Sequence, residues 1–312
     1  MTAYHTDEIS DKSFLITGGA GFIGSHIVEY LLKFGARKVR VLDNFSTGSR
    51  SNIQKFHDSP AFELIEGDIR DFDTCSACCK GIQYISHQAG LGSVPRSISD
   101  PVLTNSVNIS GFLNILTAAK NSDVKRLIYA ASSSTYGDHP ALPKEEDKIG
   151  KPLSPYAVTK YVNELYADVF SRLYSFHTVG LRYFNVFGPR QNPAGPYAAV
   201  IPLFFKAAMQ KTRPTINGDG ESSRDFTYIE NVVQANIKGL LSENIDKHEV
   251  LNVAFGKKTT LNDLWSQIAL LAGVSESPIY GPERKGDVKH SLASITKAQQ
   301  IIDYRPQVSP QE

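Results

Sequence analysis

A glycine cluster near the N-terminus constrains the fold more than any other feature of the chain. In the segment SFLITGGAGFIGSHIVEYLL, an apolar run ends directly before the glycines and an amphipathic pattern follows them. Gly18, Gly21 and Gly24 give the spacing TGxxGxxG, and Gly19, Gly21 and Gly24 also satisfy GxGxxG. Glycines at these places allow a tight turn, a close approach of the backbone to a pyrophosphate, and close packing of a helix on a strand. The segment therefore predicts a strand, a phosphate-binding turn and a helix whose N-terminal amide groups face an anion.

Short apolar runs alternate with longer amphipathic stretches up to about residue 185, a pattern typical of a parallel sheet flanked by helices. The expected strands are 13–17, 38–42, 62–66, 83–87, 126–131 and 178–183. The expected helices are 21–34, 101–121 and 154–174. The sequence thus predicts an α/β protein with a doubly wound parallel sheet, the Rossmann fold.

The rest of the chain breaks this rhythm with Pro- and Gly-rich loops such as GPRQNPAGPY. A helix at 229–242 and a strand at 249–253 are expected to return to the main sheet. We therefore expect a nucleotide-binding domain at residues 1–185, to which residues 225–255 return. Residues 186–224 and 256–312 are expected to form a smaller C-terminal α/β domain that binds the substrate.

Two acidic residues follow the second and third expected strands. Asp43 ends the second strand in VLDN, 19 positions beyond Gly24. A carboxylate there accepts hydrogen bonds from an adenosine ribose and repels a 2′-phosphate, so NAD is favoured over NADP. Asp68, in EGDI, is a plausible contact for the adenine edge, and capping of the next helix is the alternative role.

A tyrosine and a lysine are spaced for proton transfer in the segment SPYAVTKYVNE. Tyr156 and Lys160 lie four residues apart, so both face the same side of a helix. A phenol with a pKa of ~10 is a poor base, but a nearby ammonium group favours the phenolate. This pair could remove a hydroxyl proton, although such spacing also occurs by chance on exposed helices.

Three serines follow the fifth expected strand in the run AASSSTYG. Ser132, Ser133 and Ser134 lie where the carboxyl ends of parallel strands bind ligands. We expect Ser132 to hydrogen-bond the reacting oxygen, with Ser133 as an open alternative. For Ser134 the competing role is turn and helix-cap chemistry.

Composition excludes several classes of protein. Lys and Arg number 33 against 32 Asp and Glu, with no long run of one sign, so neither nucleic acid nor a membrane is expected as a partner. The polar N-terminus has no apolar signal segment, and a cytoplasmic location is expected. Cys75, Cys78 and Cys79 crowd into CSACC, where we expect reduced, partly buried thiols and no metal site.

Together these motifs resemble the extended short-chain dehydrogenase/reductase family. The segments GSVPRSISDP, AASSSTYGDHP, KPLSPYAVTKYVNELYADVFSR and RYFNVFGPRQNP are similar to the bacterial UDP-N-acetylhexosamine 4-epimerases of the WbpP type. The resemblance implies a cytoplasmic isomerase of polysaccharide biosynthesis that interconverts UDP-GlcNAc and UDP-GalNAc through a transient 4-keto sugar. It also implies that NAD stays bound through the cycle, and that a homodimer forms through helices 101–121 and 154–174.

The resemblance also assigns roles to individual residues. The implied NAD contacts are Gly18, Gly21, Phe22, Ile23, Gly24, Asp43, Asn44, Gly48, Asp68, Ile69, Gln88, Ala89, Asn108, Tyr156, Lys160 and Tyr183. The implied UDP-sugar contacts are Ser93, Arg96, Ser132, Ser133, Ser134, Asn185, Tyr197, Val200, Asn217, Arg224, Arg284, Asp287 and Ser291. Of these, Arg224 and Arg284 would clamp the diphosphate through the paired donors of the guanidinium group.

The choice among related activities depends on small side chains. Relatives that dehydrate or decarboxylate nucleotide sugars carry acidic residues where this chain has Ser133 and Ser134, which cannot act as general acids. Ser291 leaves room for an N-acetyl group, which favours N-acetylhexosamines over plain hexoses. The alternatives are 4-epimerases of UDP-glucose/galactose or of UDP-N-acetylhexosaminuronic acid, and a non-catalytic protein that binds NAD or nucleotide sugars.

Overall fold

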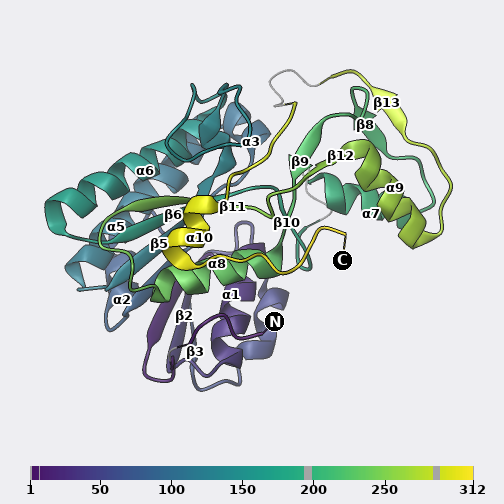
Figure 1. Cartoon of the computed structure of the whole chain (residues 1–312). Coiled ribbons are helices and arrows are strands. Elements are labelled where there is room, and N and C mark those ends of the chain that lie inside the picture. Colours follow the sequence, from purple (N-terminus) through teal and green to yellow (C-terminus); the bar gives the residue numbers. More distant parts are fainter. Residues whose placement is uncertain (1, 7, 193–198, 284–288, 312) are drawn as a thin grey trace.

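The computed structural model describes residues 2–6, 8–192, 199–283 and 289–311 (Figure 1). Its main feature is a seven-stranded sheet in the order β11-β6-β5-β4-β1-β2-β3, in which every neighbouring pair is parallel. The strands are β1 (Ser13–Thr17), β2 (Lys38–Asp43), β3 (Phe62–Glu66), β4 (Tyr84–His87), β5 (Arg126–Ser132), β6 (Thr178–Tyr183) and β11 (Glu249–Val253). The predicted doubly wound fold is confirmed, and each predicted strand agrees to within one residue at either end.

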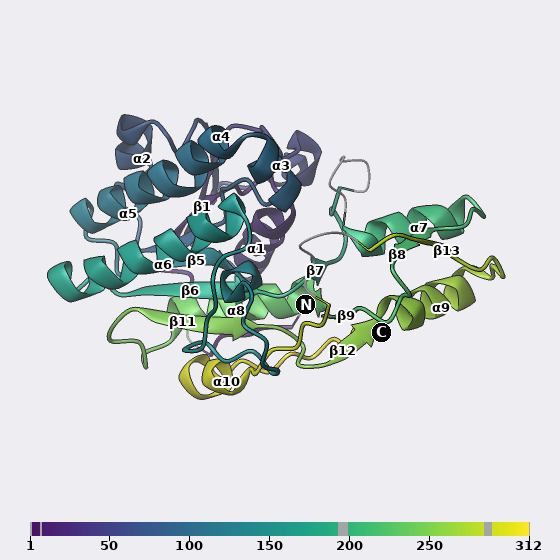
Figure 2. The same ribbon diagram turned by 90° about the horizontal axis from the view of Figure 1, so that it is seen from above.

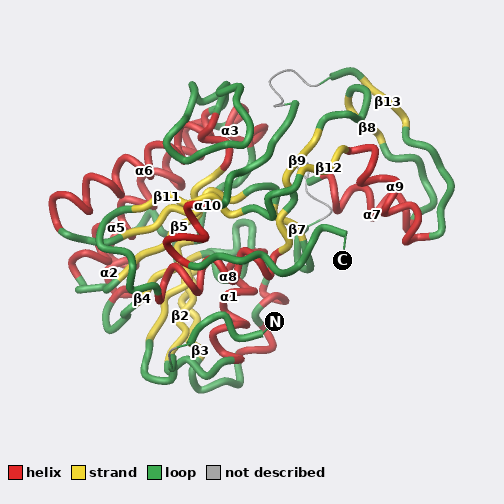
Figure 3. The backbone as a smooth tube through the Cα atoms, viewed as in Figure 1, coloured by secondary structure: helices red, strands yellow, loops and turns green. Residues whose placement is uncertain are grey.

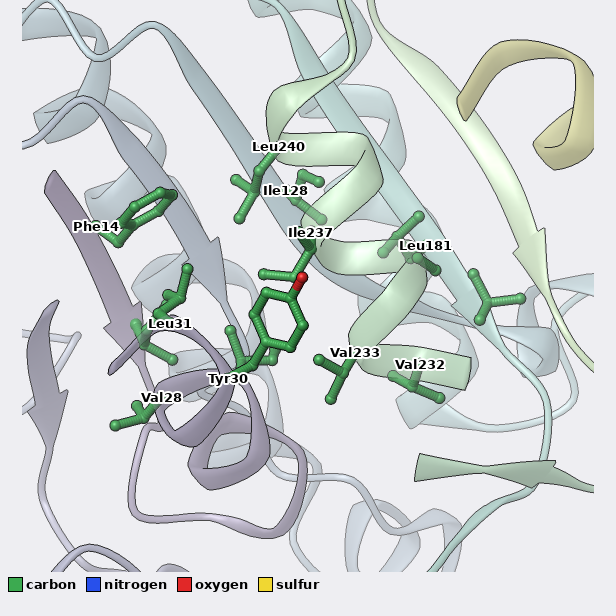
Figure 4. Packing of buried hydrophobic residues seen from close by; sticks show 14 of the residues in the cluster. Phe14, Val28, Tyr30, Leu31, Ile128, Leu181, Val232, Val233, Ile237 and Leu240 are labelled. Carbon is green, nitrogen blue, oxygen red and sulfur yellow. The ribbon is translucent and has the colours of Figure 1, made fainter. Parts of the chain in front are cut away.

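Helices cover both faces of this sheet (Figures 1 and 2). One face carries α1 (Phe22–Lys33) and α8 (Ile229–Leu241), and the other carries α2 (Phe72–Cys79), α5 (Gly111–Asn121) and α6 (Pro155–Tyr174). Figure 4 shows Tyr30 of α1 pointing toward Val233 and Ile237 of α8, so the two helices share one apolar core over the sheet. No helix among the described residues is long and apolar enough to cross a membrane.

The predicted helix 101–121 is interrupted. The structure has α4 (Pro101–Asn105), then a wider π-helical turn at Ser106–Ser110, then α5. The Asn108 side chain lies in this turn and hydrogen-bonds the backbone of Leu91, which a regular apolar periodicity does not reveal. Single π-helical turns inside α-helices are frequent at functional sites.

A smaller lobe lies beyond the carboxyl ends of the strands, and Figure 3 shows that its helices and short strands are joined by long loops. Its core packs Phe204 of α7 (Val200–Met209) edge-on against Trp265 of α9 (Leu261–Ala272), with ring centroids 5.7 Å apart. The short strands of this part are β7 (Val186–Phe187), β8 (Thr215–Asn217), β9 (Ser223–Asp225), β10 (Thr227–Tyr228), β12 (Lys258–Thr260) and β13 (Ile279–Gly281).

The end of the chain returns to the main sheet. Ala298 and Ile302 of α10 (Thr296–Ile302), together with Tyr304, pack in the same core as α8 and β11. The sequence division had placed these residues in the substrate domain, because periodicity over seven residues does not say which core a short helix joins. The division by binding function stays a prediction.

One buried carboxylate connects the smaller lobe to the main sheet by hydrogen bonds. Asp225 of β9 accepts backbone N–H groups from Phe255 (3.2 Å), Gly256 (3.1 Å) and Ala293 (3.1 Å). Phe255 and Gly256 lie in the loop after β11, and Ala293 lies in the segment that leads into α10. Asp225 therefore fixes the neighbouring Arg224 relative to the main sheet.

Candidate active site

A cleft of about 340 Å³ opens at the carboxyl ends of β1, β2, β3 and β4. This is the edge at which open α/β sheets bind nucleotides. The cleft is lined by most of the residues predicted to contact NAD, namely Gly18, Gly21, Phe22, Ile23, Gly24, Asp43, Asn44, Asp68, Ile69, Gln88 and Ala89. Lining residues that we did not predict are Leu42, Ser46, Thr47, Gly67, Gly90, Leu91, Gly92 and Val107. Gly67 directly follows the predicted strand 62–66, and Gly90, Leu91 and Gly92 come shortly after the predicted strand 83–87, so their position was the available signal.

The glycine loop is packed too tightly for side chains. A Cβ on Gly18, whose φ is +68°, would lie 2.7 Å from the Ala89 nitrogen, and a Cβ on Gly24 would lie 2.2 Å from the Gly18 oxygen. Helix α1 begins at Phe22 with Gly21 as its N-cap, so no side chain caps its first amide groups. Free amides and the positive end of the helix dipole suit a pyrophosphate.

The two acidic residues have different surroundings. Asp43 is buried and accepts the N–H groups of Ala20 (2.9 Å) and Phe45 (2.8 Å), one on each oxygen, which leaves lone pairs for ribose hydroxyls. Its pKa is raised by burial, against which the two backbone donors act. Asp68 is held by Arg70, whose hydrogen bonds lower its pKa to about 2.

The helix-capping role that the sequence left open for Asp68 is wrong. Asp71 is the N-cap of α2, where its side chain accepts the N–H of Asp73. Asp68 lines the cleft instead, and its contact with adenine stays a prediction.

Three residues predicted to touch NAD lie just behind the lining of the cleft. A Cβ on Gly48 would lie 2.9 Å from the Ala20 carbonyl carbon. Asn108 accepts the N–H of Leu91 over 2.8 Å and donates to the Thr159 hydroxyl over 3.1 Å. Tyr183 donates its hydroxyl to Gln88 Oε1 over 3.2 Å and accepts from Asn236 Nδ2 over 2.9 Å. Asn108 and Tyr183 thus hydrogen-bond Leu91 and Gln88, which line the cleft, and Gly48 packs on Ala20. Their contacts with NAD stay predictions.

Ser132, Tyr156 and Lys160 come together from two elements. Ser132 ends β5, while Tyr156 and Lys160 lie in the first turns of α6, whose N-cap Ser154 accepts the N–H of Ala157 over 3.1 Å. The side chains of Ser132 and Tyr156 share a hydrogen bond. Lys160 Nζ lies 5.8 Å from the centroid of the Tyr156 ring.

Burial shapes the protonation of this group. It lowers the pKa of Lys160 to about 8, since the ammonium loses its water while Nζ donates to the Ala130 carbonyl over 2.7 Å. It raises the pKa of Tyr156, and the hydrogen bond with Ser132 opposes that rise. The group also borders the cofactor cleft, because a Cβ on Gly90 would lie 3.7 Å from Lys160 Nζ.

The three serines after β5 have different surroundings. Ser132 Oγ accepts the Ser134 backbone N–H over 3.2 Å and the Ser134 hydroxyl over 2.8 Å. Ser134 therefore makes the turn contact that was its alternative role, and it orients Ser132. Ser133 is partly exposed in the same short 3₁₀ turn, Ser133–Tyr136.

A second cleft, of about 640 Å³, lies in the smaller lobe between α7, β8 and β9. It is lined by four residues predicted to contact the UDP-sugar, Asn185, Val200, Asn217 and Arg224. Arg224 Nη1 donates to the carbonyls of Ser223 and Lys289, over 3.0 and 3.2 Å.

The other predicted substrate residues are spread more widely. The Ser291 N–H donates to the Ser223 carbonyl over 3.0 Å, which places Ser291 beside β9. Ser93 caps α3 (Val94–Ser99) by accepting the Arg96 N–H over 3.2 Å. Tyr197, Arg284 and Asp287 lie outside the described residues.

The model of the NAD dependent epimerase/dehydratase family matches residues 14–254. The chain belongs to the NAD dependent epimerase/dehydratase family. Membership confirms that it is an enzyme with NAD as cofactor, as the cleft at the glycine loop indicates.

Three members of the epimerase/dehydratase family illustrate the similarity. A putative UDP-glucose 4-epimerase of Methanocaldococcus jannaschii is 37% identical over 300 residues, 96% of this chain and 94% of its own. The structure of a UDP-N-acetylglucosamine 4-epimerase from Methanobrevibacter ruminantium, in complex with UDP-N-acetylmuramic acid, is 41% identical with a TM-score of 0.91, covering 96% and 94% of the two chains. The structure of Thermus thermophilus UDP-glucose 4-epimerase with NAD is 35% identical with a TM-score of 0.85, covering 96% of each chain.

Proposed function

We propose that this enzyme is an NAD-dependent 4-epimerase of UDP-sugars that interconverts UDP-GlcNAc and UDP-GalNAc. The observation that carries the proposal is the meeting of Ser132, Tyr156 and Lys160 beside the cofactor cleft. Bound NAD supplies the acceptor and then the donor of a hydride at C4 of the sugar.

The residues of the chain supply the proton transfer. Tyr156, as phenolate, accepts the proton of the sugar 4-hydroxyl, and Ser132 donates a hydrogen bond to the same oxygen. The Lys160 ammonium favours the phenolate by charge attraction. When the sugar is reduced from its opposite face, Tyr156 returns the proton, so the cycle inverts C4 and consumes no cofactor.

The surroundings of Ser132 favour epimerisation over elimination or decarboxylation. Dehydration needs an acid to expel a hydroxyl group and a base at the neighbouring carbon. Ser133 and Ser134 offer only hydroxyl groups at these positions, and Ser134 is already engaged with Ser132. In contrast, 4-epimerisation needs only a proton carrier at O4 besides bound NAD.

The N-acetylated substrate is supported by two observations. Ser291 lies beside β9, next to the strand residue Arg224 that lines the second cleft. By the family resemblance, a small side chain at this position leaves space for an N-acetyl group, and the Methanobrevibacter relative is named for a UDP-N-acetylated sugar. Because two relatives are named as UDP-glucose 4-epimerases, UDP-glucose and UDP-galactose are the second candidate pair of substrates.

A substrate panel tests this choice. Purified enzyme should convert UDP-GlcNAc with a kcat/KM above those for UDP-glucose and for UDP-N-acetylgalactosaminuronic acid. Conversion can be followed by anion-exchange chromatography of the nucleotide sugars. A higher kcat/KM for either competitor would refute the proposed substrate and leave the 4-epimerase class intact.

The rate of epimerisation should rise with pH through about 8. The active pair, a Tyr156 phenolate beside a Lys160 ammonium, holds one proton fewer than the fully protonated pair. Burial lowers the pKa of Lys160 to about 8 and raises that of Tyr156, so the proton lost near pH 8 leaves mainly from Lys160. The phenolate–ammonium pair is the minor tautomer of the same protonation state, so its population rises with pH up to about 8. Below that value kcat should fall about tenfold per pH unit. A kcat that is flat from pH 6 to 9 would contradict this role for the pair.

We also propose a homodimer that forms through α6 and α4. Along one side of α6, Val158, Leu165 and Val169 are 45%, 49% and 36% exposed, and Val102 of α4 is 78% exposed. Helices α4 and α6 pack side by side, so the exposed apolar side chains of the two helices together form a larger apolar surface. An apolar surface of this kind marks a contact with another chain.

Leu165→Glu should convert the dimer to a monomer. A carboxylate buried unpaired in the interface costs several kcal/mol, which raises the dissociation constant at least ~100-fold. Light scattering at micromolar protein should give 34.3 kDa for the variant and twice that mass for the wild type. Leu271→Glu, on the exposed side of α9, is the control that should stay dimeric. A dimeric Leu165→Glu protein would place the interface elsewhere.

A further inference from the structure

Arg190 links the NAD-binding helix to the segment that borders the second cleft. Its Nη1 donates to Ser25 Oγ over 3.1 Å, and its guanidinium group forms an ion pair with Glu29. Ser25 is fully buried, and Ser25 and Glu29 lie one turn apart on α1. Arg190 is thus bound to the helix whose N-terminus forms part of the cofactor cleft.

The segment that carries Arg190 begins in the second cleft. Asn185 and the two residues of β7 line that cleft, and β7 pairs with β10. A turn then follows, in which Gln191 donates its N–H to the Gly188 carbonyl over 3.3 Å and its Nε2 to the Val186 carbonyl over 3.1 Å. Residues 185–192 therefore form one short unit with the cleft at one end and α1 at the other.

The backbone of this unit adopts conformations that need support. Asn185 and Arg190 have φ values of +34° and +66°, in the left-handed region that side chains other than glycine disfavour. Such conformations persist where surrounding contacts determine them. At Asn185 the contact is Nδ2 donating to the Asp225 carbonyl over 3.3 Å, and at Arg190 it is α1.

We propose that Arg190 is a positioning residue for UDP-sugar binding. By attaching residues 185–192 to α1, it holds Asn185 and Phe187 in place in the second cleft. The inference rests on the proposed function, because it assumes that this cleft takes the nucleotide sugar. Arg190 itself is not assigned a contact with either ligand.

Glu29 offers a matched comparison. Lys55, from the 3₁₀ turn Gln54–Phe56, forms a second ion pair with the same carboxylate, and among the described residues no hydrogen bond or ion pair joins it to residues 185–192. Lys55→Gln removes one charge from Glu29 and leaves the link to the cleft intact. Arg190→Gln and Glu29→Gln each break the link, one from either side.

Four single variants and one double variant test the inference on the NAD-loaded enzyme, by ligand affinity, kinetics, NAD content and hydrogen exchange. In Arg190→Gln, the Kd of UDP by calorimetry and the KM for UDP-GlcNAc should rise roughly tenfold, because a charge-assisted contact is lost. The kcat should stay within about twofold, and bound NAD should be unchanged, because Ser132, Tyr156 and Lys160 are untouched. Amide hydrogen exchange in residues 185–192 should accelerate, which a merely stabilising residue elsewhere would not cause.

The other variants separate the possible causes. Glu29→Gln should raise the UDP Kd and the KM for UDP-GlcNAc as much as Arg190→Gln does. The double variant should raise them no further than either single variant. Arg190→Lys should recover part of the affinity, and Lys55→Gln should behave as wild type. An unchanged UDP Kd with unchanged exchange in Arg190→Gln would overturn the proposal, as would loss of NAD together with a fall in kcat. A wild-type enzyme that neither binds UDP nor epimerises UDP-sugars would refute the proposed function and with it the substrate role of Arg190.

Discussion

Tyr156→Phe should lower kcat for 4-epimerisation about 10²- to 10⁴-fold, the range that one positioned acid–base group contributes. The substitution removes the hydroxyl group that shares a hydrogen bond with Ser132 and leaves the ring in place. Lys160 keeps its hydrogen bond to the Ala130 carbonyl, so the cleft that holds NAD should be unchanged. Affinity for UDP-GlcNAc should change little, because the lost group acts mainly on the reacting proton.

The measurement is kcat for UDP-GlcNAc together with the NAD content of the purified variant. Tyr161→Phe, one residue beyond Lys160 on the same helix, is the control that should retain wild-type kcat. If Tyr156→Phe keeps more than a tenth of the wild-type kcat with NAD bound, another group carries the proton. That result would make Tyr156 a bystander and assign the proton transfer to another side chain.

Gly24→Ala should weaken NAD binding. The added Cβ would lie 2.2 Å from the Gly18 oxygen and 2.8 Å from the Gly19 Cα, and both neighbours are backbone atoms that cannot turn aside. The glycine loop or the start of α1 must therefore shift, which costs roughly 1–3 kcal/mol of stability. A shifted loop no longer presents its amide groups to the pyrophosphate, so the Kd of NAD should rise more than about tenfold, which corresponds to a loss of more than about 1.4 kcal/mol in binding. The variant should therefore purify with less NAD than the wild type.

Gly35→Ala, just beyond the other end of α1, is the matched control. A Cβ there meets nothing within 4 Å, and only the φ of +77° disfavours it, at a cost of about 1 kcal/mol. This variant should lose some thermal stability and keep its NAD. Absorbance of released cofactor gives the NAD content, and thermal unfolding gives the stability. Full NAD content in a folded Gly24→Ala protein would contradict the packing argument.

The cofactor side of the site could be predicted because its signals are local in sequence. The glycine loop and Asp43 each directly follow an apolar strand, and strand ends of a parallel sheet meet at one edge. Tyr156 and Lys160 share a helix, so their spacing alone brings them together. These features depend on neighbours a few residues away.

The remaining differences come from contacts between distant segments. We predicted NAD contacts for Asn108 and Tyr183, but not the π-helical turn that brings Asn108 to Leu91 or the hydrogen bond that Asn236 of α8 donates to Tyr183. The return of α10 to the main core and the link from Arg190 to α1 likewise join residues far apart in sequence. Periodicity describes one element at a time, so it cannot show such partners.

The most direct test of the account is incubation of the NAD-loaded enzyme with UDP-GlcNAc alone, followed by proton NMR of the sugar. We predict that UDP-GalNAc appears until the two epimers reach equilibrium, with no added cofactor and no net reduction of the bound NAD. Starting from UDP-GalNAc should give the same final mixture. A folded, NAD-loaded enzyme that forms no UDP-GalNAc would contradict the proposed function.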